Sequence, residues 1–317
     1  MRFIFMNHQQ KGQVFADALK VKGGTSIPYP LLPGYKYIKD DFVLTDSDAS
    51  PGKVHRLSML RNQTKIKTFI VYPHAARPPL YADLYPVFQH TTMQMVSAVE
   101  HVKILRIIGY EKPMVVVGWS LCPIRKFRRT WLDYKRPLKV LFAPIHPHCA
   151  SIDKDVNRKV YSILSKLHTE GFIELTVRFI KSMESSGLSN ERIPKVIYSQ
   201  GLMDGDYHQI DLSDVVVSHQ TFAYIAVARG IPTVMMAEDM PTHTVKSDDG
   251  YVCARQWDKY KDRLMYPLDI LNCEDPLMLL HRSSQDDSAI VDWRERLIGK
   301  QFVPETFWEL IKEYIHG

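Results

Sequence analysis

The stretch "SDVVVSHQTFAYIAVARGIPTVMM", Ser213 to Met236, constrains the fold more than any other part of the chain. Its two ends are continuous apolar runs without alternation, which is typical of short strands buried on both faces. Between them Phe222, Ile225 and Arg229 recur at helical spacing. Gly230 and the proline two residues later are a helix stop signal. The stretch therefore predicts a β-α-β unit of a parallel sheet.

The residues between the first strand of such a unit and its helix lie at the carboxyl edge of the sheet. Unpaired amide hydrogens and the helix dipole favour an anion there. Ser218, His219, Gln220 and Thr221 occupy this place and are predicted to hold a phosphate group. The alternative is that Ser218 or Thr221 only caps the helix, since both residue types are common caps.

The first half of the chain alternates between strand-like and helix-like segments. Strands are expected over 2–6, 42–45, 67–73 and 114–117 and just before Ser97, and helices over 13–20, 54–61 and from Val99 to Ile108. The pattern begins again at Pro137, with a strand over 139–143, a helix carrying the stripe Val156, Val160, Leu164 and Leu167, and strand candidates over 173–180 and 195–200. Alternation of this kind predicts parallel sheets covered by helices on both faces.

The length of 317 residues favours two α/β domains in tandem. We expect a first domain over residues 1–133 and a second over 134–300. An amphipathic helix should follow in 301–317, where Phe307, Leu310, Ile311 and Tyr314 share one face that needs a surface to cover.

A basic segment, "RKFRRTWLDYKRPLK", lies near the expected boundary and contributes to the net charge of +6. Basic and aromatic side chains mixed in this way can follow a sugar-phosphate backbone. The candidate nucleic-acid-binding residues are Arg125, Lys126, Arg128 and Arg129. The alternative is a solvated surface segment or a hinge between domains, because runs of charge are usually solvated.

Several classes of protein are not supported by the sequence. It contains neither G-x-G-x-x-G nor G-x-x-x-x-G-K-[ST], and no G-x-S-x-G elbow. Its four cysteines are widely separated, which argues against a zinc knuckle and a disulfide framework. No run approaches the about 18 apolar residues of a membrane span, and the amino terminus lacks the features of a signal peptide. We therefore expect a cytoplasmic protein.

The remaining polar candidates follow predicted strands. His74 comes directly after the strand 67–73, and an imidazole with an ordinary pKa of about 6.5 can take a proton from an acceptor hydroxyl. The alternative is that this loop histidine has only a structural role.

Other strand ends offer groups for a bound donor. We expect His146 and His148 to contact its phosphate rather than to bind a metal, although Cys149 and Asp153 follow them closely in the sequence. Ser199 and Gln200 follow another predicted strand. Glu238 and Asp239 could accept hydrogen bonds from ribose or sugar hydroxyls, or be ordinary surface charge.

Three motifs resemble the GT-B glycosyltransferase superfamily, near the CDP-glycerol glycerophosphotransferases and UDP-N-acetylglucosamine 2-epimerases. "FIVYPHAARP" looks like the strand-His-Gly acceptor segment, with His74 on the catalytic histidine and Ala75 in place of glycine. "KVLFAPIHPH" looks like the strand that opens the donor domain, and "SDVVVSHQTFAYIAVARGIPTVMMAEDMP" like the donor-binding β-α-β unit.

The resemblance implies two Rossmann-like domains facing across a cleft, with the last helix crossing back to the first domain. It implies His74 as base, the donor diphosphate at Ser218 to Thr221, positive charge from His219 or His146 on the leaving group, and no essential metal. One departure concerns the glutamate that holds the ribose in many relatives, because Ile225 stands at that place beside Tyr224.

The function expected from these features is transfer of a sugar from a nucleotide-sugar, with UDP as the expected nucleotide, to a hydroxyl acceptor. The basic segment favours a hydroxylated base in DNA as the acceptor. The alternatives are a glycerophosphotransferase-like enzyme, a noncatalytic nucleic-acid-binding protein, and a UDP-sugar 2-epimerase-like isomerase. The isomerase would need acid/base carboxylates, and the available ones are Asp17, Asp83, Glu238 and Asp239.

Overall fold

The structure, a computed structural model, describes residues 2–6, 13–27, 40–46, 51–64, 66–72, 91–107, 109–128, 136–145, 154–180, 183, 186–199, 205–236, 259–260, 262–285 and 287–316. The chain divides into two units. Unit 1 comprises residues 1–121 and 296–317, and unit 2 comprises residues 122–295. The division lies earlier in the chain than the expected boundary after residue 133.

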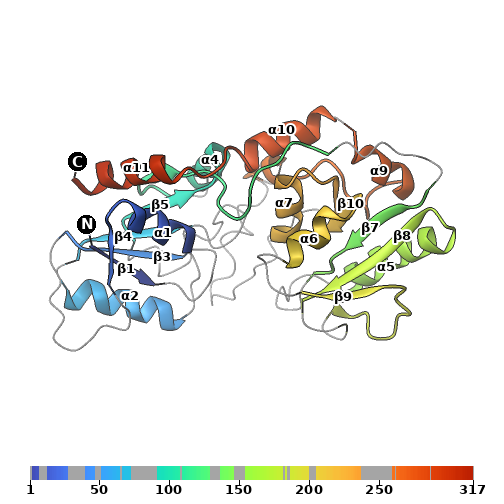
Figure 1. The fold of residues 1–317 in the computed structure, drawn as a ribbon, viewed down its shortest axis with the longest axis horizontal. Helices are drawn as coiled ribbons and strands as arrows, with labels where there is room; N and C mark the ends of the chain where they lie inside the picture. Colours follow the sequence, from blue (N-terminus) through green and yellow to red (C-terminus); the bar gives the residue numbers. More distant parts are fainter. Residues whose placement is uncertain are drawn as a thin grey trace. The chain divides into compact units, whose positions relative to one another are not determined.

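Unit 1 is built on a six-stranded parallel sheet with the strand order β2-β1-β3-β4-β5-β6 (Figure 1). Its strands are β1 Arg2–Met6, β2 Thr25–Ile27, β3 Phe42–Asp46, β4 Thr68–Tyr72, β5 Met93–Val96 and β6 Met114–Val116. Its helices are α1 Gln13–Val21, α2 Pro51–Gln63, α4 Val99–Ile107 and α11 Pro304–His316. Five of the strands were predicted from sequence, whereas β2 was not. The order 2-1-3-4-5 is that of flavodoxin-like sheets, extended here by β6.

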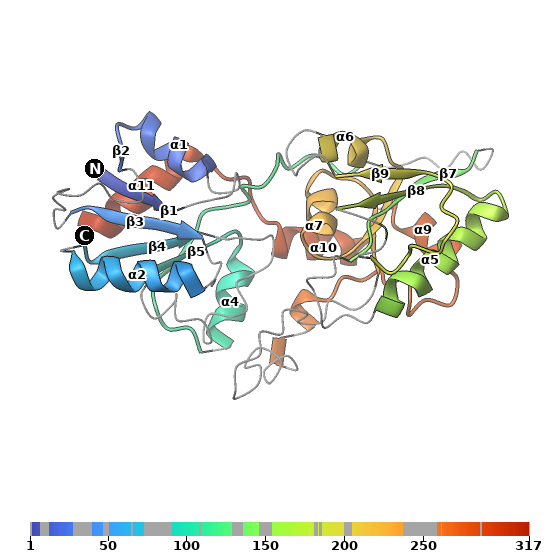
Figure 2. The ribbon, with the colours of Figure 1, turned by 90° about the horizontal axis from the view of Figure 1, so that it is seen from below.

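Helix α11 returns to unit 1 from the far end of the sequence, as expected. Phe307 of α11 and Phe302 just before it pack edge-on against Phe15 of α1, with ring centroids 5.5 and 5.1 Å away. All three rings belong to the same buried core as strands β1 and β3. Figure 2 shows α11, in red, beside the blue elements of this unit. The apolar face of α11 therefore completes the core of unit 1.

Unit 2 is built on a five-stranded parallel sheet with the order β11-β10-β7-β8-β9. Its strands are β7 Leu138–Phe142, β8 Ile173–Phe179, β9 Val196–Tyr198, β10 Val215–Ser218 and β11 Thr233–Met235. Its helices are α5 Lys154–Thr169, α6 Gly205–Asp211, α7 Gln220–Ala228, α9 Pro276–Arg282 and α10 Ser288–Leu297, whose end passes into unit 1. Counted from β7, this is the Rossmann order 3-2-1-4-5.

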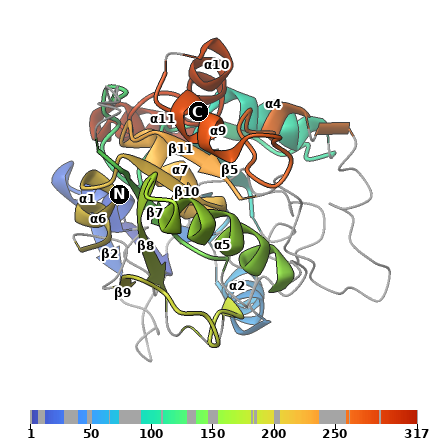
Figure 3. The same ribbon diagram turned by 90° about the vertical axis from the view of Figure 1, so that its right-hand side faces the viewer.

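The helices of unit 2 cover both faces of its sheet. In Figures 1 and 2, α5 and α6 lie on opposite sides of β8 and β9, as right-handed crossovers in opposite directions require. Figure 3 shows α9 beside β11. The predicted β-α-β unit is confirmed as β10, α7 and β11.

Helix α7 differs from the prediction in two respects. Its N-cap is His219 in extended conformation, with no capping hydrogen bond from the side chain, so neither Ser218 nor Thr221 caps it. Every residue from Phe222 to Arg229 is buried, so α7 has no exposed face. Packing on all sides explains why the sequence is apolar all round rather than striped.

Gly230 ends α7 in the way predicted. Its φ is +75°, and the Ile231 N–H donates to Ala226 while the Gly230 N–H donates to Val227, which is a Schellman motif. The glycine also touches the basic segment, because a Cβ here would collide with the carbonyl oxygen of Lys126. Gly230 is therefore required by its conformation and by its neighbour.

The start of the basic segment is fastened to the end of α7. The Arg125 N–H donates to Ala228 at 2.9 Å, and the Arg128 N–H donates to the Gly230 carbonyl at 2.6 Å. The side chain of Arg294 from α10 also donates to the Arg125 carbonyl. These bonds place residues 122–128 in unit 2 and explain why the division precedes residue 133.

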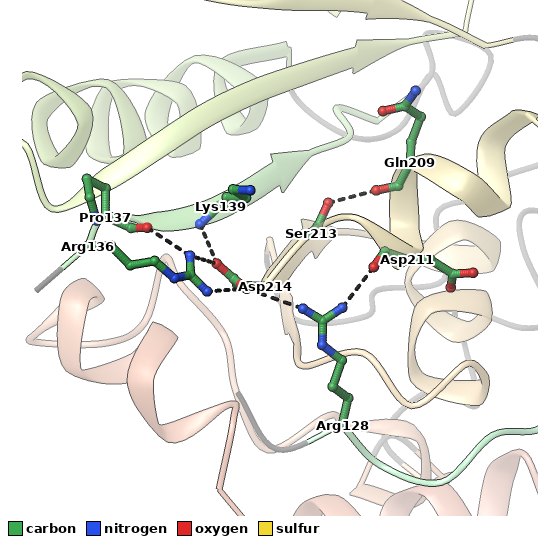
Figure 4. A network of polar contacts seen from close by, with 8 residues as sticks. All are labelled: Arg128, Arg136, Pro137, Lys139, Gln209, Asp211, Ser213 and Asp214. Atoms are coloured by element: carbon green, nitrogen blue, oxygen red, sulfur yellow. Dashed lines mark hydrogen bonds and ion pairs between the residues drawn. The ribbon is translucent and has the colours of Figure 1, made fainter. Parts of the chain in front are cut away.

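A network of charges joins the same segment to the amino edge of the sheet (Figure 4). Asp214, 1% exposed, accepts two hydrogen bonds from Arg136, at 2.6 and 3.1 Å, and one from the Lys139 N–H at 2.9 Å. Arg128 lies 3.4 Å from the same carboxylate. Burial alone would raise the pKa of Asp214, but the hydrogen bonds from Arg136 and Lys139 outweigh it and the pKa is lowered.

Asp211, at the end of α6, accepts hydrogen bonds from neighbouring arginines. It accepts from Arg229 Nε at 2.8 Å and from Arg125 at 3.2 Å. Burial again opposes ionisation, and the bonds from Arg229 and then Arg125 lower the pKa of Asp211 below its usual value. Two carboxylates therefore neutralise much of the charge that the basic segment brings to this edge.

Replacing Gly230 with alanine is expected to destabilise unit 2 by about 2–4 kcal/mol, since the change adds both left-handed strain and a backbone collision. Gly171→Ala is the matched control, because its φ is +81° but no atom lies within 4 Å of the added Cβ. The control should cost only the strain, about 1 kcal/mol. Denaturant unfolding measures both variants, and equal losses would refute the collision with Lys126.

Asp214→Asn is expected to reduce stability by about 2 kcal/mol at pH 7, because it removes the acceptor of charged hydrogen bonds. A carboxyl whose pKa is lower in the folded than in the unfolded state stabilises above its unfolded pKa of about 3.9 and loses that contribution as pH falls further. Unfolding free energies measured from pH 6 to pH 2.5 should thus fall less steeply in the variant. Asp155→Asn, whose side chain is 57% exposed on α5, is the control and should follow the wild type. Superimposable wild-type and Asp214→Asn curves would contradict the assignment.

Candidate functional site

The topology of unit 2 marks one position on its sheet. Strands β7 and β10 are neighbours, but the chain leaves β7 towards β8 and β9 and later returns to β10 on the other side. The connections after β7 and β10 therefore diverge. Open α/β sheets bind their ligands at such a switch point, at the carboxyl ends of the strands. The candidate site is thus defined by the residues that follow β7 and β10.

Ser218, the last residue of β10, joins the two strands at this point. Its hydroxyl donates to the Ala143 carbonyl at 3.0 Å, and the Ala143 N–H donates back to Val217 at 3.0 Å. A hydroxyl carries a single proton. In this arrangement the proton of the Ser218 hydroxyl is used in a hydrogen bond within the sheet. The side chain therefore fixes the end of β10 and does not donate a hydrogen bond to a phosphate.

The next residues begin α7 and present its first turn to the same edge. His219 is the N-cap and is 6% exposed, whereas Thr221 in the first turn is half-buried. Gln220 is the first helical residue. The first N–H groups of a helix have no partner within the helix and carry partial positive charge. The backbone at 220–222 is accordingly the part of the predicted phosphate site that this topology favours most.

The connection after β7 is held by a buried amide. Asn157, in the first turn of α5, accepts from the Ile145 N–H at 2.9 Å and donates to the Ile145 carbonyl at 3.2 Å and to Ser186 at 2.9 Å. Its side chain is 5% exposed. His146 and His148 lie outside the described residues. Ile145, the residue before them, is held through both its backbone N–H and its carbonyl.

The ends of β8 and β9 supply a residue that the sequence reasoning missed. Arg178 of β8 is 4% exposed and donates to the Ser199 hydroxyl at 2.7 Å. Its guanidinium lies 4.4 Å from the ring centre of Phe222 in α7. The signal available was a basic residue near the end of a mostly apolar strand, "IELTVRFI". Ser199, a predicted donor-binding residue, therefore shares this edge with the start of α7.

Buried side chains occupy the position where the resemblance led us to expect a glutamate. Ile225 is 1% exposed, and the Tyr224 ring packs edge-on against Trp293 of α10 with centroids 4.9 Å apart. Neither side chain is therefore exposed to solvent.

Several predicted residues cannot be placed. His74, Gln200, Glu238, Asp239 and Arg129 lie outside the described residues. Of the carboxylates considered for isomerisation, Asp83 also lies outside them, and Asp17 is exposed on α1, where it accepts from Gln13 at 2.7 Å.

Three of the predicted nucleic-acid-binding residues, Arg125, Lys126 and Arg128, lie at the opposite edge of the unit 2 sheet from the switch point. Arg125 and Arg128 engage Asp211 and Asp214 there, as Figure 4 shows for Arg128. Lys126 contributes its backbone to the contact with Gly230. These contacts anchor the described part of the basic segment to unit 2, and nucleic-acid binding by these residues stays a prediction.

Within the described ranges, no three His, Cys, Asp or Glu side chains gather in a way that could hold a metal ion. Cys122 and Cys273, the two cysteines in those ranges, are thiols. None of the helices in the described part of the chain combines the length and apolarity that crossing a membrane requires.

No protein-family model matches this sequence, and no curated protein matches it significantly. Solved structures do. Staphylococcus aureus MnaA in a co-structure with UDP gives a TM-score of 0.58 at 11% identity, over 99% of this chain and 96% of that one. The Neisseria meningitidis UDP-GlcNAc 2-epimerase bound to UDP-GlcNAc gives 0.54 at 9% identity, over 99% and 98%.

A third structure is a transferase. The lipopolysaccharide outer core galactosyltransferase WaaB in its apo form gives a TM-score of 0.52 at 10% identity, over 99% of this chain and 100% of that one. Identities this low establish the architecture alone. Two Rossmann-like units of parallel strands, with the last helix returned to the first unit, together give this chain the GT-B fold.

Proposed function

We propose that this chain is a cytoplasmic glycosyltransferase that moves a sugar from a nucleotide-sugar donor, UDP-linked, to a hydroxyl acceptor. The observation that carries the proposal is the switch point of unit 2, where the first turn of α7 follows β10 directly beside the end of β7. A Rossmann-like sheet with a helix N-terminus at this place is suited to a diphosphate.

The donor is assigned to the residues around that turn. The diphosphate would lie against the backbone N–H groups at 220–222, with His219 and Thr221 beside it. Ser199 would contact the nucleoside from the end of β9. UDP as the nucleotide is supported by the UDP and UDP-GlcNAc held by two proteins of similar architecture.

His74 is proposed as the general base, on the motif resemblance and on its place directly after β4. It would take the proton of the attacking acceptor hydroxyl, while positive charge from His219 or His146 stabilises the departing diphosphate.

A UDP-sugar 2-epimerase is the second candidate, favoured by the epimerase of similar architecture. It would convert the sugar without an acceptor. Of the four carboxylates considered for that chemistry, Asp17 alone lies among the described residues, where it is exposed on α1 and accepts a hydrogen bond from Gln13.

The acceptor proposed from the basic segment is a hydroxylated DNA base. Arg125 and Arg128 already pair with carboxylates, which reduces the charge they could offer to DNA phosphates. The acceptor is therefore tested with DNA carrying a hydroxymethylated base beside a panel of small polyols.

UDP is expected to stabilise the chain more than CDP, GDP or ADP. A ligand at one hundred times its Kd adds about 2.7 kcal/mol to the stability of the folded state, enough for a clear rise in Tm. Differential scanning fluorimetry with each diphosphate measures this. When the chain is then incubated with labelled UDP-sugars, the labelled sugar should be transferred to DNA or to a polyol. Interconversion of the UDP-sugar without transfer would establish the epimerase instead, and an unchanged Tm with all four diphosphates would remove the proposal.

His74→Ala and His219→Ala are expected to separate catalysis from donor binding. Loss of a general base lowers kcat by about 10²–10⁴-fold, whereas the Kd for UDP should stay near that of the wild type. His219→Ala should instead raise the Kd for UDP. Isothermal titration with UDP and initial transfer rates measure the two effects, and His55→Ala on α2 serves as a control histidine. Full turnover by His74→Ala would exclude it as the base.

A further inference from the structure

The positive charge of the chain is concentrated in one segment of unit 1. Unit 1 holds 18 lysines and arginines against 11 aspartates and glutamates, whereas unit 2 holds 23 against 24. Residues 49–82 contain no aspartate or glutamate. Their basic residues are Lys53, Arg56, Arg61, Lys65, Lys67 and Arg77. The charge of this segment therefore equals the net charge of +6 of the whole chain.

Helix α2 displays part of this segment to solvent. Leu57 and Leu60 are buried and attach the helix to unit 1. The exposed residues in the described part of the helix are His55, Arg56, Met59, Arg61 and Asn62. Figures 1 and 2 show α2 and α11 on opposite faces of the unit 1 sheet, so α11 does not cover this side. The outer side of α2 is thus basic, and Met59, 41% exposed, is its exposed large apolar residue.

The charge continues past the end of α2 to the amino edge of the sheet. Arg61 lies in the last turn of the helix, and Lys67, which directly precedes β4, is exposed. Lys112, just before β6, donates to the Thr91 carbonyl at 2.7 Å. Burial, and then the charge of Arg61, lower the pKa of Lys112, so these two cations lie close enough to repel each other. Three parts of unit 1 therefore bring positive charge to one edge.

This excess does not depend on any single side chain being unpaired. If every acidic residue of unit 1 neutralised one basic residue, seven positive charges would still remain. Three of the acidic residues already pair with basic residues outside 49–82, in the pairs Asp41–Arg2, Asp17–Lys20 and Glu100–Lys103. A hydrogen bond to a carbonyl, such as that of Lys112, leaves the charge in place.

A charge distribution of this kind fits the backbone of a nucleic acid better than other anions. A helix of 13 residues is about 20 Å long, and a DNA duplex carries about twelve phosphate charges over that length. A single small anion would engage only a part of it. A helix that binds an anionic membrane inserts an apolar face, whereas the apolar face of α2 is used by the core through Leu57 and Leu60.

We propose that the outer side of α2 and the adjoining amino edge of the unit 1 sheet, with Arg56, Arg61 and Lys67, form a surface that binds duplex DNA through its phosphates. It belongs to unit 1, whereas the basic segment and the candidate donor site belong to unit 2. The choice of DNA rests on the proposed function, which names DNA as an acceptor. Phosphate contacts hold and orient a duplex without reading its sequence.

The test is fluorescence anisotropy of a labelled DNA duplex with the full chain, without a nucleotide-sugar, at salt concentrations from about 50 to about 200 mM. The triple variant Arg56→Gln, Arg61→Gln, Lys67→Gln removes three charges from the surface. Each phosphate contact contributes about 0.9 to the slope of log K against log salt, so the slope should become less steep by about 2.7. Affinity at about 100 mM salt should fall more than tenfold.

The matched control removes the same charge from exposed positions of unit 2. Lys159 and Lys166 lie on α5, and Lys195 precedes β9. Lys159→Gln, Lys166→Gln, Lys195→Gln should keep the wild-type slope. An equal loss of slope in the two triple variants would show that net charge and not position decides, and would overturn the inference.

Other outcomes also decide the matter. A wild-type chain that does not bind the duplex at about 50 mM salt overturns the inference. Tighter binding to phosphatidylserine vesicles or to an RNA duplex, at equal phosphate concentration, would assign the surface to another partner and overturn it too. If the α2 triple variant does not fold, Lys67→Gln replaces it and should reduce the slope by about 0.9, and an unchanged slope overturns the inference.

The outcome for this surface and the outcome for the proposed function are measured separately. A chain whose Tm rises with UDP but which binds no DNA refutes this inference alone. A chain that binds DNA through α2 but binds no diphosphate refutes the proposed transferase and leaves the surface in place.

Discussion

The pairing of β10 with β7 is the interaction on which the rest of unit 2 depends. Val215, Val216 and Val217 lie opposite Val140, Leu141 and Phe142, and all six are buried. A buried polar side chain fastens the pair at each end, Ser218 to Ala143 at the carboxyl end and Asp214 to the Lys139 N–H at the amino end. A shift of one residue would break both fastenings and turn every side chain to the other face. The switch point is therefore fixed in register before any ligand is considered.

Basic side chains are held by partners at both edges of this sheet. At the amino edge, arginines from the basic segment and from α7 meet Asp211 and Asp214, and the pKa values of both carboxyls are lowered by these partners. At the carboxyl edge, Arg178 is oriented by a hydroxyl and a ring. The mild positive charge of the whole chain thus says little about where a phosphate would bind within unit 2, because partners at both edges engage its basic side chains.

Much of the fold could be predicted because its signals are local. The apolar runs of β10 and β11, the helical middle and Gly230 specify a β-α-β unit within one short stretch, and the same alternation located the other long strands. Strand β2 was not recognised because two of its three residues are polar, whereas the equally short β6, β9 and β11 consist mostly of apolar residues. Strand order could not be predicted either, since it depends on pairing between segments as distant as β7 and β10.

The position of the candidate site in the fold could be predicted from the sequence, but the contacts of its side chains could not. Sequence placed Ser218 to Thr221 at a strand end, yet the use of the Ser218 hydroxyl depends on Ala143, a partner from another strand. The capping expected of Ser218 or Thr221 failed because His219 takes the N-cap position. Arg178 was overlooked because a single charge in a strand has no meaning until its neighbours Ser199 and Phe222 are known. Asp214 and Arg128 are likewise joined only by the fold.

The burial of α7 accounts for the apolar residues at the position where the resemblance led us to expect a glutamate. Trp293 of α10 packs against Tyr224, and residues 122–128 cover the end of the helix. With Ile225 and its neighbours all buried, a carboxylate at this position would lose its hydration without gaining a ligand. The apolar side chains of α7 and the elements that cover the helix therefore depend on each other. Under the proposed function, the buried side chains of α7 do not hold the ribose, and its recognition falls to other segments.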